Sequence, residues 1–447
     1  MTRAGGRPPS PARDVATRVL HRVDRDGAWA TPVLDAELSR RELTPRDAAL
    51  ATEIVYGALR VLPSLDAALA ARLRRPDRTE AYLRASLRAA AYQLRHLARV
   101  PALAAVADAV ALVRRERGAG LARVANAVLR RLALDRPAAP APPDRIDLPA
   151  WVEERLRASV GDRESRAFLA GRRLPPPLGL RAVREDPVAL ARTLRERGAE
   201  VATSRFAPRG VAVRGAGDPR RLPGYATGAF EVQELGAQVA CAYVAARPGE
   251  AVADVCAGRG TKALALAEAV GPTGRVVAAD RLPEKLAAIP PARRRLGLDA
   301  VPVETQGVDI TVGLGGLAGP FDRVLVDAPC TGLGTVHRRP ELVLRLTPGD
   351  PARLAELQGA LLRRASSLVR PGGLLAYVVC SPLAEEGAAV ADAFEGEAPG
   401  FHRVTEVPPG LPAADSDGVV RLGPWTDADV ALDAYQVARW RAPGSPG

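Results

Sequence analysis

Cysteine is scarce in this sequence, and the few cysteines are not spaced for a metal site or a disulfide scaffold. The 447 residues include 4 Cys and 4 His. No two cysteines have the C-x-x-C spacing of a zinc site, and the histidines stand singly. Four thiols in a chain of this length also do not amount to a disulfide scaffold. The sequence therefore predicts neither a metal site nor a disulfide framework.

Long apolar runs are also missing. The most apolar helical stretch, residues 100–113, is too short to cross a bilayer and contains Asp108. The opening residues, MTRAGGRPPSPARD, lack the apolar segment of a signal peptide. We therefore expect a cytoplasmic protein with no membrane partner.

Lysine and asparagine are nearly absent. The lysines are Lys262 and Lys285, the one asparagine is Asn126, and every other basic residue is arginine. This bias is typical of a G+C-rich genome, in which a surviving lysine reflects either a chemical requirement or chance. The net charge is +12, and residues 1–148 carry most of it, with 26 arginines against 16 acidic residues. Such a basic region favours a nucleic-acid partner, although solvated arginine faces would explain part of the excess.

The apolar pattern divides the chain into three predicted domains. Residues 1–140 are predicted to form an all-α domain, because apolar residues recur every three or four positions from 14 to 134. The proline-rich stretch at 136–143 is typical of a linker, and residues 141–233 contain its end and a small α/β, RRM-like domain. Residues 234–447 alternate helices with buried strands, which is typical of a doubly wound, mostly parallel, Rossmann-like sheet. Such sheets bind ligands beyond the carboxyl ends of their strands.

A glycine-rich turn follows a predicted strand that ends near Asp254. The turn reads CAGRGTK from Cys256 to Lys262, and its glycines allow a close backbone approach while leaving helix amides free for an anion. It is neither a P-loop nor a G-x-G-x-x-G fingerprint. One strand later, Asp280 is placed to bind the two hydroxyls of a ribose. Both NAD enzymes and S-adenosylmethionine enzymes share this pattern, and an aspartate that only caps a turn is the non-functional alternative.

Two of the cysteines also stand at predicted strand ends. Asp327 ends one strand and begins DAPCTGLG, which contains Cys330. The next strand follows a predicted turn at 371–373 and ends at Cys380. Because strand ends converge in a doubly wound fold, we expect a carboxylate and two thiols beside the glycine turn. Packing is the usual role of a single cysteine, but it explains two cysteines at strand ends poorly.

Long stretches of the sequence resemble one known family. They are RDAALATEIVYGALRVLPSLD, NAVLRRL, LPGYATGAFEVQE, FDRVLVDAPCTGLGTVHRRPEL and LQGALLRRASSLVRPGGLLAYVVCSPLAEE. These resemble RNA cytosine-5 methyltransferases of the NOL1/NOP2/Sun family, in particular the RsmB/Sun/Fmu type, which modifies 16S rRNA and has a NusB-like N-terminal RNA-binding domain. The resemblance implies a methyltransferase that uses S-adenosyl-L-methionine and has 16S rRNA as its partner. It also implies an enzyme without a metal, and we expect a monomer.

The resemblance assigns a role to each site residue. Cys380 would be the nucleophile that adds to C6 of cytosine, Cys330 the second catalytic thiol, and Asp327 a catalytic carboxylate beside the base. The residues that would contact S-adenosylmethionine or the target base are Cys256, Ala257, Gly258, Arg259, Gly260, Thr261, Lys262, Asp280, Asp309 and Asp327. Because C6 is reached only in an unstacked base, the substrate should be a single-stranded or flipped cytosine.

Other functions share parts of this pattern. A DNA cytosine-5 methyltransferase also has Pro-Cys at a strand end, but it needs a Glu-Asn-Val motif, which a chain with Asn126 as its one asparagine cannot provide. An NAD dehydrogenase shares the glycine turn and has no use for paired thiols. Two alternatives stay open: a tRNA cytosine-5 methyltransferase, and a NusB-like RNA-binding or ribosome-assembly factor with a decayed methyltransferase domain. Retention of Lys262 and both thiols argues against decay.

Overall fold

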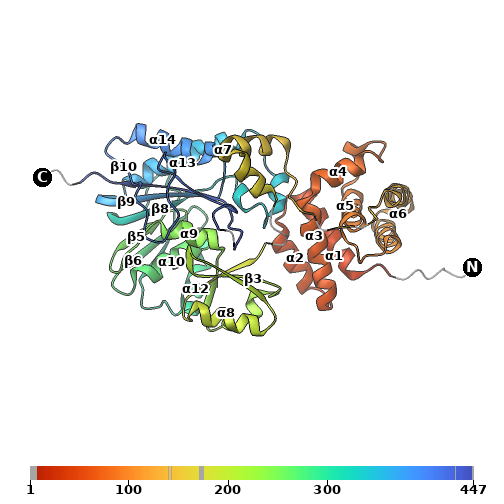
Figure 1. Cartoon of the computed structure of the whole chain (residues 1–447), viewed down its shortest axis with the longest axis horizontal. Helices are drawn as coiled ribbons and strands as arrows, with labels where there is room; N and C mark the ends of the chain where they lie inside the picture. The colour runs from red at the N-terminus through yellow and green to blue at the C-terminus, as the bar shows by residue number, and fades with distance from the viewer. Residues whose placement is uncertain (1–7, 139, 142, 171–175, 428, 445–447) are drawn as a thin grey trace, which may run out of the picture. The chain divides into compact units, whose positions relative to one another are not determined.

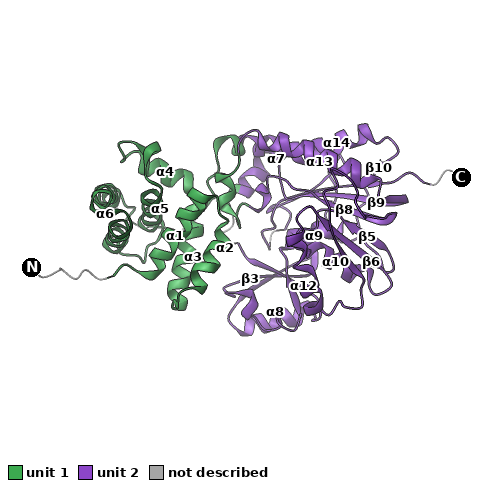
Figure 2. Cartoon of the chain, turned by 180° about the vertical axis from the view of Figure 1, so that it is seen from behind, with its two compact units in different colours: residues 1–153, 169–175, 336–346 green, residues 154–168, 176–335, 347–447 purple. Residues whose placement is uncertain are grey.

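The chain was analysed as a computed structural model, coloured along its length in Figure 1. The described residues are 8–138, 140–141, 143–170, 176–427 and 429–444. The chain forms two compact units, shown in different colours in Figure 2. The helical unit comprises 1–153, 169–175 and 336–346, and the sheet unit comprises 154–168, 176–335 and 347–447. The domain boundaries expected from the sequence stay predictions.

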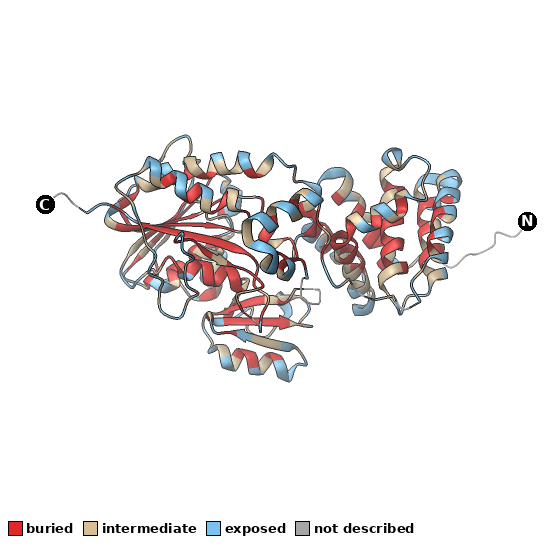
Figure 3. Ribbon diagram, turned by 45° about the horizontal axis from the view of Figure 1, so that its top comes forward, coloured by how far each residue is buried: buried red, intermediate tan, exposed pale blue. Residues whose placement is uncertain are grey.

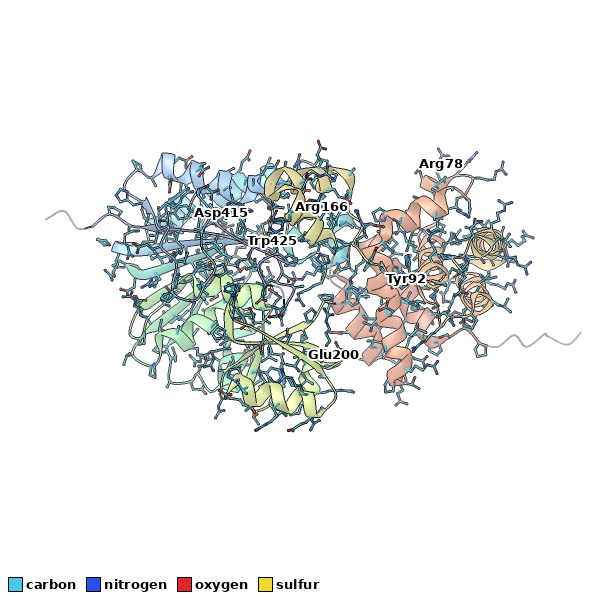
Figure 4. The ribbon with its side chains drawn as sticks, in the orientation of Figure 1. Arg78, Tyr92, Arg166, Glu200, Asp415 and Trp425 are labelled. Carbon is cyan, nitrogen blue, oxygen red and sulfur yellow. The ribbon has the colours of Figure 1, made fainter. Side chains whose placement is uncertain are left out.

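The helical unit is all-α, as the spacing of apolar residues predicted. Its elements are α1 (Pro11–Asp26), α2 (Ala30–Ser39), α3 (Pro45–Arg60), α4 (Leu62–Ala70), the 3-10 turn η1 (Pro76–Arg78), α5 (Ala81–His96) and α6 (Ala102–Leu134). α3 begins at Pro45 because the first helical residue needs no N–H donor. The helices pack around one apolar core, in which Tyr92 of α5 is 1% exposed (Figure 4). Gly57 of α3 leaves room for its ring, since a Cβ there would lie 2.0 Å from it.

Among the described residues, no single helix is long and apolar enough to cross a membrane. α3 and α4 reach the required length and composition only as a pair, which is bent by 79°. Both helices bury apolar side chains in the core of the helical unit, including Ile54 and Leu65.

A segment far along the chain also belongs to the helical unit. Residues 336–346 contain the 3-10 turn η4 (Pro340–Leu344). Glu341 of this turn is 1% exposed and accepts a hydrogen bond of 3.0 Å from the Ala30 amide at the start of α2. Residues 336–346, which follow Cys330 by a few positions in the sequence, are therefore part of the helical unit.

The sheet unit contains a small antiparallel sheet, which agrees with the predicted small α/β layer. Its strand order is β2-β3-β1-β4, and α8 packs against it. The apolar residues of β1, β3 and α8 form a separate small core that includes Leu180, Val211 and Leu190. The elements are β1 (Leu178–Ala182), α8 (Pro187–Glu196), β2 (Glu200–Ser204), β3 (Ala207–Arg214), the 3-10 turn η2 (Pro219–Arg221) and β4 (Phe230–Val232). α7 (Ala150–Leu169), kinked at Gly161, precedes them.

The large sheet is mostly parallel, as predicted for a doubly wound fold. Its order is β10-β12-β9-β8-β5-β6-β7, and β11 pairs with β12. β5 to β9 are parallel to one another, whereas β10, β11 and β12 pair antiparallel. The strands are β5 (Ala251–Asp254), β6 (Arg275–Asp280), β7 (Val303–Gly307), β8 (Phe321–Asp327), β9 (Val369–Val379), β10 (His402–Arg403), β11 (Val420–Leu422) and β12 (Tyr435–Arg441).

Helices cover both faces of this sheet. They are α9 (Leu235–Ala242), α10 (Thr261–Val270), α11 (Pro283–Leu286), α12 (Ile289–Leu296), α13 (Asp350–Ser366) and α14 (Ala388–Glu397), with 3-10 turns η3 (Leu333–Thr335) and η5 (Ala384–Glu386). Alternate residues of β9 enter different cores: Ala376 packs with α9, α10 and α12, whereas Tyr377 packs with α13 and α14. The central strands β5, β6, β8 and β9 are therefore buried on both faces (Figure 3), which explains their continuous apolar runs.

One local prediction is wrong. The expected turn at 371–373 lies within β9 as a bulge, where Gly372 has a φ of +68° and the pairing with β8 shifts register. The strand resumes at Leu374, which pairs with Arg323 of β8. The antiparallel strands β10 to β12 were not predicted, since two of them are only two or three residues long.

Candidate active site

The predicted site residues gather at one edge of the large sheet. β9, β8, β5 and β6 are consecutive in the strand order, as Figure 1 shows. Their carboxyl ends carry Cys380, Asp327, Asp254 and Asp280, and Asp309 follows the neighbouring strand β7. This is the edge at which parallel sheets bind ligands.

The glycine turn adopts a conformation that requires its glycines. Gly258 and Gly260 have φ values of +55° and +82°. A Cβ on Gly260 would lie 2.3 Å from Ile289, whereas a Cβ on Gly258 would meet nothing within 4 Å. The Gly258 amide donates a hydrogen bond of 2.9 Å to Asp280. The backbone at Gly258 is therefore open on one side and held by the next strand end on the other.

The remaining residues of the turn differ in exposure. Cys256 and Ala257 are partly buried, Arg259 is exposed, and Thr261 is the first residue of α10. Burial and the surrounding carboxylates, Asp254 first among them, raise the pKa of Cys256 well above its ordinary value of 9.0. Cys256 is therefore a neutral thiol.

Two carboxylates beside the turn are held in place by local hydrogen bonds. One oxygen of Asp280 accepts from the Gly258 amide, and the other accepts from the Leu282 amide at 2.9 Å. Asp309 accepts from the amide of Thr311 at 3.0 Å and from its hydroxyl at 2.6 Å. The hydroxyl hydrogen bond is the main reason that the pKa of Asp309 lies below its ordinary value of 3.8. Asp309 is therefore a fixed anion at neutral pH.

Lys262 and Asp327 form an ion pair at the centre of this edge. Their Nζ and Oδ2 atoms are 2.7 Å apart. Burial alone would lower the pKa of Lys262, but the ion pair with Asp327 and the nearby Cys380 raise it above its ordinary value of 10.5. The ammonium also lies 5.6 Å from the ring centroid of Tyr435. Lys262 is therefore a permanent cation beside the thiols.

Asp254 at the end of β5 is fully buried. Its relative exposure is 0%. Burial, and then the negative charge of Asp327, raise the pKa of Asp254 to about 7. This carboxyl was not among the predicted site residues, although an acid at a strand end is the signal that identified Asp280.

The raised pKa of Asp254 predicts a pH-dependent stability. Between its ordinary pKa of 3.8 and the folded pKa of about 7, the unfolded chain has lost a proton that the folded chain keeps. This group should therefore lower the free energy of unfolding by up to about 1.4 kcal/mol per pH unit as the pH rises through that window. Asp254→Asn should flatten this part of the curve, measured by urea denaturation from pH 4 to 8. Parallel curves for both proteins would contradict the assignment.

The two thiols of the strand ends meet. The sulfur atoms of Cys330 and Cys380 are 3.4 Å apart, and both cysteines are free and partly buried. The Gly334 amide donates to the Cys380 carbonyl at 3.0 Å, which links the backbones of the two loops. The predicted convergence of the strand ends therefore brings both sulfurs within reach of one substrate atom.

Opposite charges face the two thiols. Lys262 interacts electrostatically with Cys380, whereas the hydrogen bond with Cys380, burial and the nearby Glu386 raise the pKa of Cys330 well above 9.0. A cation favours a thiolate, and an anion favours a neutral thiol. The two sulfurs, which look equivalent in the sequence, are therefore electrostatically different.

Sequence reasoning missed the residues that surround Cys330. Glu386 is 0% exposed and accepts hydrogen bonds from Thr331 and Ser381. Gln358 of α13 donates to the Pro329 carbonyl at 3.0 Å. Glu386 belongs to the stretch that resembles the family, but no local pattern marks it as buried. Among the described residues, no group of three His, Cys, Asp or Glu side chains could hold a metal ion.

Comparison with known proteins gives consistent matches over both units. Residues 241–406 match the family described as 16S rRNA methyltransferase RsmB/F, and residues 10–134 match the NusB family. The ribosomal RNA small subunit methyltransferase B of Thermus thermophilus is 37% identical, covering 96% of this chain and 97% of the relative. The probable ribosomal RNA small subunit methyltransferase B of Synechocystis is 33% identical, covering 83% and 85%.

Solved structures share the fold. The crystal structure of PH0851 has a TM-score of 0.81 and 22% identity, and the match covers 98% of this chain and all of that one. The structure of NSun6 from Pyrococcus horikoshii with SFG has a TM-score of 0.55 and 18% identity, covering 66% of this chain and 98% of the other.

Proposed function

This chain belongs to the 16S rRNA methyltransferase RsmB/F family, and we propose that the two thiols at the sheet edge carry out its reaction. The enzyme transfers a methyl group from S-adenosylmethionine to C5 of a cytosine in 16S rRNA. The observation that carries the residue assignment is the pair of sulfurs 3.4 Å apart.

The glycine turn and the neighbouring carboxylates fit S-adenosylmethionine. Each oxygen of Asp280 accepts one amide hydrogen bond, which leaves lone pairs for the two hydroxyls of a ribose. The open backbone at Gly258 and the start of α10 at Thr261 suit a close approach by the amino-acid part of the cofactor. Asp309, kept anionic by Thr311, is available to an amino group. When bound, S-adenosylmethionine supplies an electrophilic methyl group.

Cys380 is the nucleophile in this proposal. C5 of cytosine reacts poorly as it stands, so the Cys380 thiolate adds to C6, and the electrons of the C5–C6 bond become available at C5. The Lys262 ammonium interacts electrostatically with Cys380. Asp327, held by Lys262 at 2.7 Å, lies at the next strand end and is available to accept a hydrogen bond from the N4 amino group of the base.

Cys330 completes the reaction in this proposal. After methyl transfer, C5 carries both the methyl group and its original proton. A base removes that proton, the C5–C6 double bond re-forms, and the Cys380 thiolate leaves C6. Cys330 is 3.4 Å from Cys380, and the hydrogen bond with Cys380 is the main reason that its pKa is raised. Once Cys380 is bonded to C6, that hydrogen bond is lost, so the Cys330 thiol can release its proton to solvent and the resulting thiolate can accept the C5 proton. We therefore assign product release to Cys330.

The direct test of the function is methylation of rRNA by the purified enzyme. Incubation of unmodified 16S rRNA with S-adenosylmethionine should produce 5-methylcytosine, located by bisulfite sequencing. Methylation of a tRNA and not of 16S rRNA would show that the protein is a tRNA cytosine-5 methyltransferase. Absence of product on every RNA, with cofactor bound, would identify a decayed methyltransferase domain.

The helical unit provides a basic surface for the RNA. Many of its arginines pair with acids, such as Arg88 with Asp24 and Asp66. Others are exposed and have no ion-pair partner among the described residues: Arg74, Arg75, Arg78, Arg114, Arg123, Arg130 and Arg131. Arg78 is labelled in Figure 4. Arg123 and Arg130 are seven residues apart on α6 and therefore share one face. We propose that this face contacts the RNA backbone.

Removal of these charges should weaken RNA binding in a salt-dependent way. The triple variant Arg123→Gln/Arg130→Gln/Arg131→Gln should make the slope of log K against log salt shallower by about 2. Each lost phosphate contact lowers the magnitude of this slope by about 0.7 for a single-stranded RNA. Filter binding at several salt concentrations measures this slope. The control changes the exposed Arg353, Arg363 and Arg364 of α13 to glutamine. An equal slope change in both variants would show that the α6 face has no special role.

The proposal also covers the domain boundaries, the oligomeric state and the cellular location of the enzyme. We propose that residues 1–140 form the NusB-like domain, 141–233 the linker and small α/β domain, and 234–447 the methyltransferase domain. We also propose that the enzyme acts as a monomer in the cytoplasm. Sedimentation at several concentrations tests the oligomeric state, and a mass that rises to twice 47.0 kDa would contradict a monomer.

A further inference from the structure

A buried carboxylate lies between the two thiol loops. Glu386 is 0% exposed. One of its oxygens accepts a hydrogen bond of 2.7 Å from the Thr331 amide, and the other accepts from the Thr331 hydroxyl at 2.6 Å and the Ser381 hydroxyl at 2.5 Å. Thr331 directly follows Cys330, and Ser381 directly follows Cys380. One side chain therefore fastens the residue after each thiol.

We propose that Glu386 is a positioning residue that sets the distance between the two thiols by tying the Cys330 loop to the Cys380 loop. The inference rests on the roles proposed above for Cys330 and Cys380. Glu386 does not need to touch the RNA or the cofactor, because it acts through Thr331 and Ser381. A tether of this kind would matter because a misplacement of about 1 Å at a reacting group can cost about 100-fold in rate.

A second set of hydrogen bonds fixes the other side of Cys330. Gln358 of α13 donates to the Pro329 carbonyl at 3.0 Å and also approaches Glu386 at 3.5 Å. Tyr377 of β9 donates to the Gln358 side chain at 3.0 Å and to the Glu386 carbonyl at 2.5 Å. The residues before and after Cys330 are therefore both anchored to one network. Glu386 extends it to the Cys380 loop, beside the Thr331–Ser381 hydroxyl contact of 3.3 Å and the hydrogen bond from the Gly334 amide to the Cys380 carbonyl.

The network also satisfies a group that is costly to bury. No ion pair of Glu386 exists among the described residues, and a buried carboxylate is destabilising unless its oxygens accept hydrogen bonds. Burial raises the pKa of Glu386, while the hydrogen bonds from Ser381, Thr331 and Gln358 oppose that rise. An apolar residue would fill this position at less cost, but it could not join the two loops.

The test compares two substitutions in the full-length enzyme. Glu386→Ala removes both tethers. Glu386→Gln keeps the size of the side chain and one acceptor oxygen, and the Thr331 and Ser381 hydroxyls can rotate to accept from its amide. Glu385→Gln is the matched control, because the neighbouring Glu385 side chain is 44% exposed and pairs only loosely with Arg155, at 3.4 Å.

A positioning role predicts a specific kinetic pattern. Glu386→Ala should lower kcat by about 10- to 100-fold with little change in KM for RNA, and should accumulate a covalent enzyme–RNA adduct, because Cys330 no longer reaches the C5 proton. Affinity for S-adenosylmethionine should be unchanged. Glu386→Gln should recover kcat to within about tenfold of the wild type, the equivalent of one lost hydrogen bond. Glu385→Gln should behave as the wild type.

A second readout measures the thiol pair without any RNA. Oxidised glutathione accepts two electrons and two protons from adjacent thiols, which gives a disulfide and two molecules of reduced glutathione. Peptide mapping of the wild type should find a Cys330–Cys380 disulfide, and Glu386→Ala should need about tenfold more oxidant to form it. This readout separates the two proposals: if the thiols prove not to be catalytic, the proposed function fails, yet the oxidation still reports whether Glu386 holds them together.

Either of two results would overturn the inference. One is a loss of kcat in Glu386→Ala that matches the loss of folded enzyme in a thermal melt, with no adduct and unchanged disulfide formation. The other is a Glu386→Gln enzyme as impaired as Glu386→Ala in both readouts, which would show that the charge, and not the tether, is what the site needs. Because Ser381→Ala removes the hydrogen bond from Ser381 to Glu386 with little loss of volume, it repeats the test if Glu386→Ala does not fold.

Discussion

Replacing Cys380 by alanine should abolish methylation and leave no covalent complex with RNA. Without the thiolate, C6 is never attacked and C5 never becomes nucleophilic, so kcat should fall by about 10⁴-fold or more, as expected for loss of a covalent nucleophile. Transfer of a labelled methyl group to rRNA measures the activity. Denaturing electrophoresis of the enzyme with RNA and S-adenosylmethionine measures the complex.

Cys330→Ala, in contrast, should leave a covalent complex between the enzyme and RNA. Addition by Cys380 and methyl transfer do not need the second thiol, whereas release does. The variant should therefore accumulate an enzyme–RNA adduct that survives denaturation, while turnover beyond the first cycle is lost.

A control cysteine makes these results interpretable. Cys241 of α9 is 6% exposed in the core of the sheet unit, so Cys241→Ala should keep both activity and release. An adduct with Cys380→Ala instead of Cys330→Ala would reverse the two roles, and the Pro-Cys thiol would be the nucleophile. Full activity in both variants would show that the thiols are packing residues.

Asp280→Ala should abolish measurable binding of S-adenosylmethionine. The carboxylate is proposed to accept hydrogen bonds from two ribose hydroxyls, each worth about 1.5 to 3 kcal/mol when one partner is charged, so the affinity should fall by at least about 100-fold. The structure adds a second reason. Asp280 also holds the Gly258 amide at 2.9 Å, and its loss would loosen the glycine turn.

Isothermal titration calorimetry of the free enzyme measures this affinity. Asp299→Ala is the control, because Asp299 is exposed. A thermal melt without the cofactor establishes that the Asp280 variant is folded. An unchanged affinity in a folded Asp280→Ala enzyme would disprove the ribose assignment.

Much of the site could be predicted because it depends on local patterns. A run of apolar residues followed by an acid marks a buried strand end, and the carboxyl ends of parallel strands share one edge. That rule predicts that Asp280, Asp327, Cys330 and Cys380 lie at one edge; in the structure the two sulfurs are 3.4 Å apart, and both aspartates end strands of the same parallel sheet. The same rule applied to Asp254 would have found the buried carboxyl at the end of β5.

The difference between the two thiols could not be predicted in this way. Lys262 lies 65 residues before Asp327 in the sequence, yet they form an ion pair. Glu386 lies 55 residues after Thr331 and accepts its amide. Such contacts depend on how α10, η5 and the two strands pack, and no local periodicity records them.

The helices, the glycine turn and the strand-end acids followed from the sequence by itself, because each depends on the conformational preferences of neighbouring residues. The tertiary structure alone decided which charge faces which thiol, and it alone placed residues 336–346 in the helical unit. The reason is physical: Glu386 is buried where the distant Thr331 amide donates to one of its oxygens, and Glu341 is buried where the distant Ala30 amide does the same.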